Sequence, residues 1–97
     1  MVELNAISQL VQAHRDDLRQ RGVKTLAVFG SVARGDNTPS SDLDILVEFD
    51  RAIGLFEFIR LKYYLESLTT CTVDLVTQDA IRPAMRENIV KEAIYVA

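Results

Sequence analysis

Three carboxylates are the residues whose types and spacing suggest chemistry in this chain. Asp42 and Asp44 lie two positions apart in an alternating segment, so on a strand both side chains leave the same face. Asp74 interrupts a second, mostly apolar segment. An unpaired carboxylate is costly on a half-buried strand, because its charged form loses hydration. The three residues are therefore candidates for a site that holds a proton or a cation.

If the strands that carry them lie side by side, the three carboxylates converge. At ~4 Å and an effective dielectric constant of about 20, each like-charged pair repels by roughly 4 kcal/mol. Ligands that are all oxygen favour a hard cation, so the cluster predicts Mg²⁺, with Mn²⁺ as the alternative, rather than zinc. A competing interpretation pairs Asp74 with a buried arginine, for which Arg34 is the candidate, and makes Asp42 part of a structural cap.

A glycine–serine pair precedes the first carboxylates. Gly30-Ser31 directly follows an apolar segment that ends at Phe29, and ten residues separate Ser31 from Asp42. Glycine lets a phosphate approach the backbone, the next N–H groups point at it, and the serine hydroxyl adds a donor. Arg34, one turn later, is either a phosphate contact or part of a structural salt bridge. A plain strand-to-helix turn is the competing explanation for Gly30-Ser31 alone.

Hydropathy indicates the elements that must position these residues. Apolar positions at helical spacing predict helices over 3–21, 55–68 and from Pro83 onward. Runs of strand-forming residues predict strands over 25–29, 42–49, 72–77 and 94–96, with a loop over 30–41 that holds at most one helical turn. This order predicts an α/β or α+β fold in which helices pack on a small mixed sheet of three or four strands.

The apolar stripes of the later helices are expected to face the core. On the second helix the stripe consists of Phe58, Ile59, Leu61, Leu65 and Leu68. On the last helix it consists of Met85, Ile89, Val90 and Ala93. Part of this apolar surface could instead serve a partner.

Length and composition bound the function. The chain has 97 residues, 48% of them hydrophobic and 26% charged, which predicts one domain spanning 1–97. A net charge of −3 argues against a protein that binds nucleic acid in bulk. Cys71 is the single cysteine, which excludes an internal disulfide and predicts a small buried residue in a reducing compartment. Without a signal peptide or an apolar span, we expect a cytoplasmic protein with no membrane contact.

The motifs together resemble a known family. Residues 30–36 read GSVARGD, residues 41–49 read SDLDILVEF and residues 73–76 read VDLV. This pattern resembles the nucleotidyltransferase superfamily that includes DNA polymerase beta, and within it the small MNT domains of MntA-type antitoxins. The resemblance continues to EAIYV at 92–96, so it covers nearly the whole chain, and no motif residue is missing.

The resemblance implies both an activity and a partner. It implies a polymerase beta-like palm fold and a Mg²⁺-dependent transferase that moves AMP from ATP to a protein hydroxyl. The acceptor would be a tyrosine of a cognate HEPN-domain RNase toxin, so that the chain is the antitoxin of a type VII-like pair and forms a hetero-oligomer with it. Direct contact with nucleic acid is not expected.

The resemblance also implies a role for each motif residue. Gly30 and Ser31 would hold the terminal phosphates of ATP, and Arg34 would add a phosphate contact. Asp42 and Asp44 would bind two Mg²⁺ ions. Asp74 would complete the shell of the first ion and help deprotonate the attacking hydroxyl.

Two other functions remain open from the sequence. The chain could be an antitoxin that neutralises its toxin by covering it, without catalysis. It could also be a subunit that modifies a small molecule or an RNA end. Larger enzymes of that kind carry an extra helical domain for the acceptor, which 97 residues do not provide. We therefore expect the partner itself to supply the acceptor surface.

Overall fold

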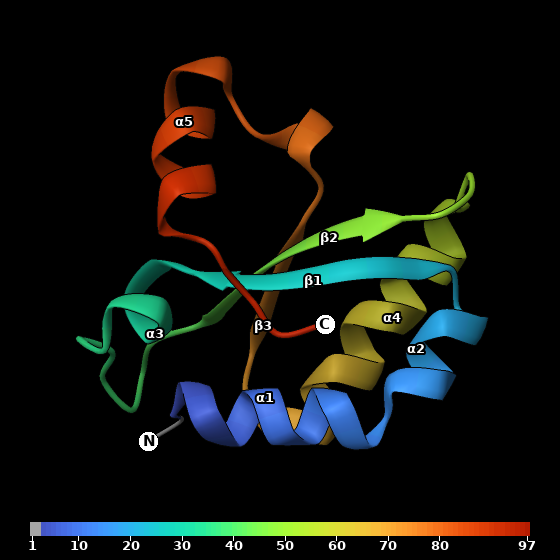
Figure 1. Ribbon diagram of the computed structural model, residues 1–97, viewed down its shortest axis with the longest axis horizontal. Helices are drawn as coiled ribbons and strands as arrows, with labels where there is room; N and C mark the ends of the chain where they lie inside the picture. The colour runs from blue at the N-terminus through green and yellow to red at the C-terminus, as the bar shows by residue number, and fades with distance from the viewer. Residues whose placement is uncertain (1–2) are drawn as a thin grey trace.

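The chain is built around one four-stranded sheet. A computed structural model describes residues 3–97 (Figure 1). The strands are β1 (Val23–Phe29), β2 (Leu43–Phe49), β3 (Val73–Val76) and β4 (Ile94–Tyr95), in the spatial order β3-β2-β1-β4. β1 runs antiparallel to both β2 and β4, whereas β2 and β3 are parallel. The mixed sheet with its helices confirms the predicted fold class.

One face of the sheet carries the main core. Helices α1 (Leu4–Ala13), α2 (Arg15–Gln20) and α4 (Leu55–Thr69) contribute buried residues to this face. Because side chains alternate along a strand, every second residue of β2 points toward these helices. The core on this side joins Ile7, Val11, Leu18, Leu26, Val28, Leu43, Ile45, Val47, Leu61, Leu65 and Val73.

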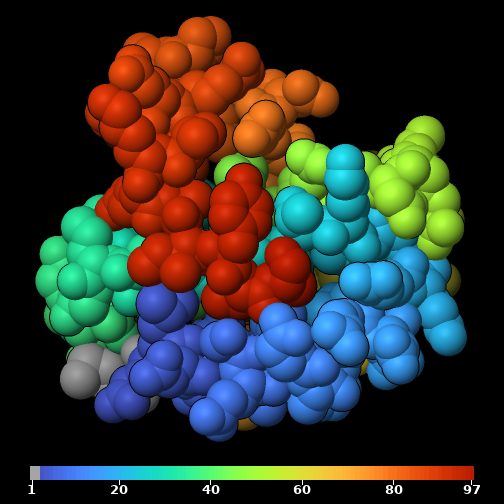
Figure 2. All heavy atoms as spheres, in the orientation of Figure 1, coloured from blue at the N-terminus to red at the C-terminus, as the bar shows by residue number. Residues whose placement is uncertain are grey.

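The other face of the sheet carries a smaller apolar cluster and the last helix. Its buried residues are Ala27, Phe29, Leu46 and Ile81. Above it stand the 3₁₀ turn η1 (Gln78–Ala80) and α5 (Pro83–Glu92). In the space-filling view this segment projects from the rest of the molecule as a lobe (Figure 2).

The sequence predicts that the stripe of the last helix is core, and this is wrong for Met85 and Val90. No residue of α5 is buried, and the side chains of Met85 and Val90 are 53% and 44% exposed. Only Ile89 and the following Ala93 pack, partly buried, against the smaller cluster. The physical reason is that this sheet face offers few large apolar side chains to cover.

The stripe of α4 is partly as predicted. Leu61 and Leu65 are buried in the main core, and Phe58 packs against it. Ile59 is exposed, together with Leu55 and Phe56 at the start of the helix. These exposed residues therefore lie on a side of α4 that faces away from the main core.

The helix predicted over 3–21 is two helices that meet at His14. The His14 ring nitrogen Nδ1 lies 2.9 Å from the carbonyl oxygen of Leu10, and its backbone N–H donates to the Val11 carbonyl at 3.1 Å. Local side-chain bonds of this kind compete with the regular helical ladder. Three apolar residues of this segment, Ile7 and Val11 of α1 and Leu18 of α2, are buried in the main core.

Two smaller observations complete the fold. Among residues 3–97, no helix combines the length and the apolar character needed to cross a bilayer. Cys71 carries a free thiol and is only partly buried, packed against the main core in the turn before β3.

Candidate active site

Two of the predicted carboxylates meet where β2 and β3 begin. Asp44 is the register partner of Asp74 in this parallel pair. Their neighbours two residues on, Leu46 and Val76, belong to the smaller cluster, so both aspartates face the side on which α5 stands. The convergence expected for adjacent strands is therefore found for this pair.

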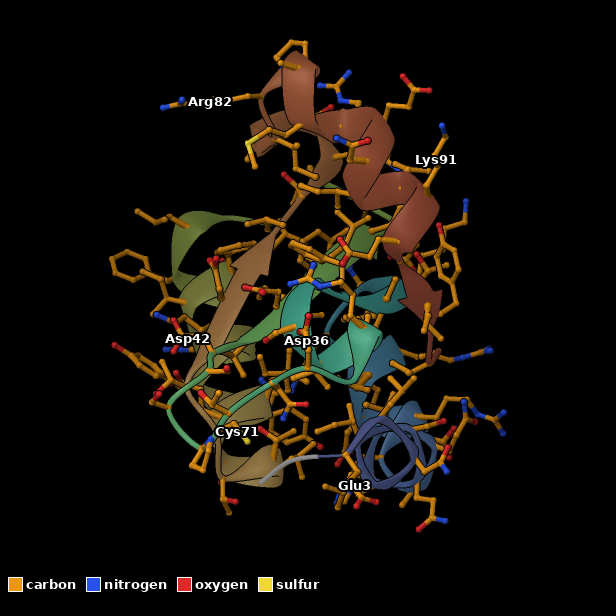
Figure 3. All side chains as sticks on the ribbon, turned by 90° about the vertical axis from the view of Figure 1, so that its left-hand side faces the viewer. Glu3, Asp36, Asp42, Cys71, Arg82 and Lys91 are labelled. Carbon is orange, nitrogen blue, oxygen red and sulfur yellow. The ribbon has the colours of Figure 1, made fainter. Side chains whose placement is uncertain are left out.

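Asp42 occupies a more open position. It precedes β2 by one residue and is exposed, and Figure 3 shows it to the left of Asp36, at about the same height. Within residues 3–97, no group of three or more His, Cys, Asp or Glu side chains is placed to hold a metal ion. The three carboxylates therefore share one end of the sheet without forming a ready-made ligand cage.

Asp44 shows how the carboxylates influence one another. The pKa of Asp44 is raised from 3.8 to about 6. Partial burial is the largest cause, and the negative charges of Asp74 and Asp42 are the next largest. A hydrogen bond with Asp74 adds to the rise, while the charge of Arg34 lowers the pKa. The negative charges at the site are thus not balanced by positive ones. Carboxylate oxygens that repel one another in this way suit a hard divalent cation, so the residues fit the Mg²⁺ that the sequence predicts.

Gly30 lets the Asp44 carboxylate approach the backbone. Helix α3 (Gly30–Arg34) starts directly at the end of β1, and Gly30 has φ +74°. A Cβ atom at this position would lie 2.2 Å from Oδ2 of Asp44. Any other residue would therefore be strained and would displace the carboxylate. The sequence predicts that Gly30 allows a phosphate to approach the backbone, and the structure shows that it also leaves room for the Asp44 carboxylate.

The turn after α3 continues the motif. The carbonyl oxygen of Ser31 accepts a hydrogen bond from the Asp36 N–H at 3.1 Å, and Gly35 caps the helix in the left-handed conformation with φ +79°. Ser31 is partly buried in the first turn of α3, next to Gly30. The glycine–serine pair and the carboxylate pair thus lie at neighbouring strand ends, at one end of the sheet.

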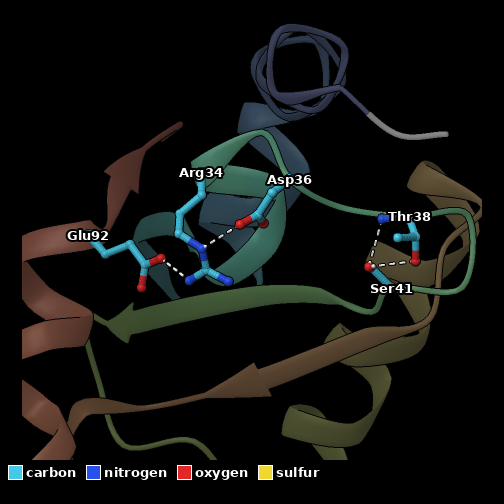
Figure 4. A network of polar contacts seen from close by, with 5 residues as sticks. All are labelled: Arg34, Asp36, Thr38, Ser41 and Glu92. Atoms are coloured by element: carbon cyan, nitrogen blue, oxygen red, sulfur yellow. Dashed lines mark hydrogen bonds and ion pairs between the residues drawn. The ribbon is translucent and has the colours of Figure 1, made fainter.

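Arg34 does not pair with Asp74, contrary to the competing interpretation. Its Nε donates to Oδ2 of Asp36 at 3.1 Å, and its Nη1 forms a short ion pair with Oε1 of Glu92 (Figure 4). The hydrogen bond with Asp36, and to a smaller extent that with Glu92, raises the pKa of Arg34. The sequence does not predict a role for Glu92, because no local pattern indicates a contact between residues 58 positions apart.

A cleft of about 410 Å³ opens beside Asp42, between the loop that leads into β2 and the turn that follows α4. Hydroxyl groups line much of it, from Thr38, Ser40, Ser41, Thr70 and Thr72. The loop is held by its own bonds, since the Thr38 N–H donates to Oγ of Ser41 at 2.9 Å (Figure 4). The sequence predicted the loop but not this cleft.

Comparison with known proteins places the chain among nucleotidyltransferases. The nucleotidyltransferase domain family matches residues 11–96. Protein adenylyltransferase MntA of Thermococcus cleftensis is 39% identical over 97 residues, which cover 99% of this chain and 98% of the relative. A Methanocaldococcus jannaschii protein, also named as a protein adenylyltransferase, is 36% identical over 98 residues, covering 99% and 100% of the two chains.

Solved structures agree with the sequence comparison. A structure described as a minimal nucleotidyltransferase superposes with a TM-score of 0.82 at 36% identity, over 96% of this chain and 95% of that one. A toxin–antitoxin complex with AMP-PNP shares the fold, with a TM-score of 0.71 at 23% identity over 96% of this chain and 71% of that one. The chain belongs to the nucleotidyltransferase domain family, in its minimal, MntA-like branch.

Proposed function

We propose that the chain is a Mg²⁺-dependent protein adenylyltransferase. It moves AMP from ATP onto a tyrosine of a HEPN-type toxin and thereby acts as an antitoxin in the cytoplasm, where ATP is available. The observation that carries the proposal is the pairing of Asp44 with Asp74 beside Gly30. It occurs in a chain whose full-length relatives are named protein adenylyltransferases.

The acceptor is inferred from solved relatives that share the fold. One match is to the structure of a complex between a tri-AMPylated HEPN toxin of Shewanella oneidensis and an MNT antitoxin, with a TM-score of 0.64 at 20% identity. By analogy, this chain forms a hetero-oligomer with a HEPN partner, works as one domain, and receives the acceptor hydroxyl from the partner. The net charge of −3 favours such a protein partner over nucleic acid.

The residues of α3 bind the nucleotide in this proposal. The backbone N–H groups that follow Gly30 and the Ser31 hydroxyl donate to the terminal phosphates. Arg34 adds a charge-assisted hydrogen bond, for which its planar guanidinium is suited. These contacts hold the triphosphate so that its α-phosphorus lies over the carboxylates.

The carboxylates carry the transfer step. Asp42 and Asp44, with Asp74, would hold the Mg²⁺ ions, which when bound neutralise charge that develops on the phosphate oxygens. The tyrosine oxygen forms a bond to the α-phosphorus, the bond between that phosphorus and the bridging oxygen breaks, and pyrophosphate leaves. Asp74 helps to remove the hydroxyl proton, a role that its place beside Asp44 on the neighbouring strand allows.

The fate of two labels tests this reaction. The purified chain, its HEPN partner and Mg²⁺ are incubated with ATP labelled either at the α- or at the γ-phosphate. We expect the α-label on the partner and the γ-label in pyrophosphate, and neither transfer with Asp44→Asn. Transfer of the γ-label to the partner would instead indicate a kinase, and no transfer of either label would contradict the proposal.

A second candidate function is neutralisation by binding alone. It is favoured by the exposed apolar side chains of Met85 and Val90 on α5, which a bound protein partner could cover. In that case the Asp42→Asn, Asp44→Asn double variant would still protect cells from the toxin while the complex stayed intact. Loss of protection with an intact complex would exclude it.

A further inference from the structure

The ion pair between Arg34 and Glu92 joins two parts of the chain that meet beside the site. Arg34 is the last residue of α3, the helix that starts at Gly30, and Glu92 is the last residue of α5. Figure 4 shows the guanidinium between the two carboxylates, above the ribbon of β2. The proposed nucleotide contacts of Arg34 involve neither Glu92 nor α5, so the proposed reaction gives this ion pair no function.

The three partners are not equally exposed. The side chain of Glu92 is 24% exposed, whereas those of Arg34 and Asp36 are 52% and 62% exposed. Asp36 is also a near neighbour of Arg34 on a surface turn, while Glu92 reaches it from a different element. Glu92 is therefore the less exposed of the two carboxylates, and it connects Arg34 to a second element.

The orientation of the guanidinium leaves it able to bind a ligand. Asp36 engages Nε and Glu92 engages Nη1, so neither of these contacts uses Nη2. The two N–H groups of Nη2 are donors of the kind that bind a phosphate oxygen. Arg34 also lies close enough to Asp44 for its charge to lower the pKa of that carboxyl.

We propose that Glu92 is a positioning residue: from the end of α5 it fixes the Arg34 guanidinium in the orientation that binds the phosphates of ATP. This inference rests on the proposed phosphate contact of Arg34. It gives α5 a role that its packing does not explain, because α5 contributes no buried residue to the core. The helix carries the carboxylate that completes the nucleotide site.

Two effects of Glu92 on ATP binding have opposite signs. A carboxylate close to a triphosphate repels it, so its removal should strengthen binding if only its charge matters. If Glu92 instead orients Arg34, its removal frees the guanidinium to adopt several rotamers and weakens binding. The direction of the change in ATP affinity therefore separates the two possibilities.

A double-mutant cycle on the dissociation constant of Mg²⁺-ATP tests the proposal with the purified chain, without an acceptor. Arg34→Ala should raise the dissociation constant roughly tenfold or more, as expected for a lost hydrogen bond to a charged group. Glu92→Ala should raise it roughly two- to fivefold, as expected for the loss of an exposed ion pair. Glu92→Gln should fall between Glu92→Ala and wild type, because its amide oxygen still accepts a hydrogen bond. In the Arg34→Ala background, Glu92→Ala should have no further effect.

The matched control is Glu87→Ala on the same helix. Glu87 is exposed and pairs with Lys91 at 3.2 Å, so its removal should leave ATP affinity unchanged. Thermal melting of every variant confirms that it is folded. Unchanged or tighter ATP binding by Glu92→Ala, or the same weakening with and without Arg34, would overturn the inference.

The outcomes distinguish the inference from the function on which it rests. If Arg34→Ala binds ATP as well as wild type while wild type still transfers AMP, the role of Arg34 and this inference are both wrong, and the transferase stands. If wild type transfers no AMP but the cycle gives the expected pattern, the positioning role stands and the proposed reaction fails. If wild type binds no ATP, both proposals are wrong.

Discussion

At Asp44 the folded protein holds a carboxyl group in surroundings that oppose its ionisation. Its pKa is raised from 3.8 to about 6, so the folded state keeps a proton that the unfolded chain releases at lower pH. Between about pH 4 and pH 6 the folded state therefore binds more protons, and the free energy of unfolding falls as the pH rises. A divalent cation bound to the ionised carboxylates would offset this loss at neutral pH.

Asp44→Asn should therefore stabilise the metal-free protein while abolishing AMP transfer. Because the carboxyl is partly exposed, we expect a gain of about 1 kcal/mol at pH 7 rather than the full value of the pKa shift. The gain should shrink as the pH falls toward about 4. Urea denaturation of both proteins in EDTA, at several pH values, measures it. A gain that does not change with pH, or a loss of stability at pH 7, would contradict this role of Asp44.

Alanine substitutions at two glycines separate backbone strain from crowding of the site. Gly30 and Gly35 have φ of +74° and +79°, but only at Gly30 would a Cβ contact Asp44, since nothing lies within 4 Å of a Cβ at Gly35. Gly35→Ala should cost about 1 kcal/mol of stability and keep the activity. Gly30→Ala should cost more and reduce AMP transfer by roughly tenfold or more. Urea denaturation and single-turnover transfer measure both effects, and equal losses of activity would contradict the crowding.

The residues of the site differ in how far the sequence reveals them. Gly30, Ser31, Asp42 and Asp44 lie within one short stretch, so their spacing alone suggests a shared site. The pairing of Asp74 depends on which strands are neighbours, and the sequence could only assume this. Glu92 could not be found at all, because its contact depends on where α5 comes to lie.

Among the elements, sequence periodicity located the helices and strands but not what lies opposite them. The stripe on α4 predicts Leu61 and Leu65 correctly, since both are buried in the main core. The stripe on α5 does not predict burial of Met85 and Val90, because the cluster that α5 could cover has four buried apolar residues. A hydrophobic pattern shows which residues of an element are apolar, whereas their burial also depends on the element that packs against them.

Two substitutions on α4 test this division. Leu61 is 1% exposed and Ile59 is 36% exposed, although both belong to the predicted stripe. Leu61→Ala should destabilise the protein by about 2–5 kcal/mol, as expected for a cavity in a core. Ile59→Ala should cost no more than about 1 kcal/mol. Chemical denaturation measures both, and similar costs would show that the two residues are equally buried.

At the scale of the whole molecule, the two faces of the sheet have different tasks. One face is closed by three helices and supplies the main core. The other carries Asp44 and Asp74 under little apolar cover, with α5 as its only long helix among the described residues. A macromolecular acceptor can approach such a face more readily than it could enter an enclosed pocket, which agrees with a protein substrate.

The most direct test of the central claim is the intact mass of the proposed HEPN partner after co-expression with this chain. With the wild-type chain we expect the partner to gain the mass of one or more AMP groups. With the Asp42→Asn, Asp44→Asn double variant we expect the unmodified mass, although the two proteins still purify together. An unmodified partner beside the wild-type chain, or the same gain with the double variant, would contradict adenylyl transfer by these carboxylates.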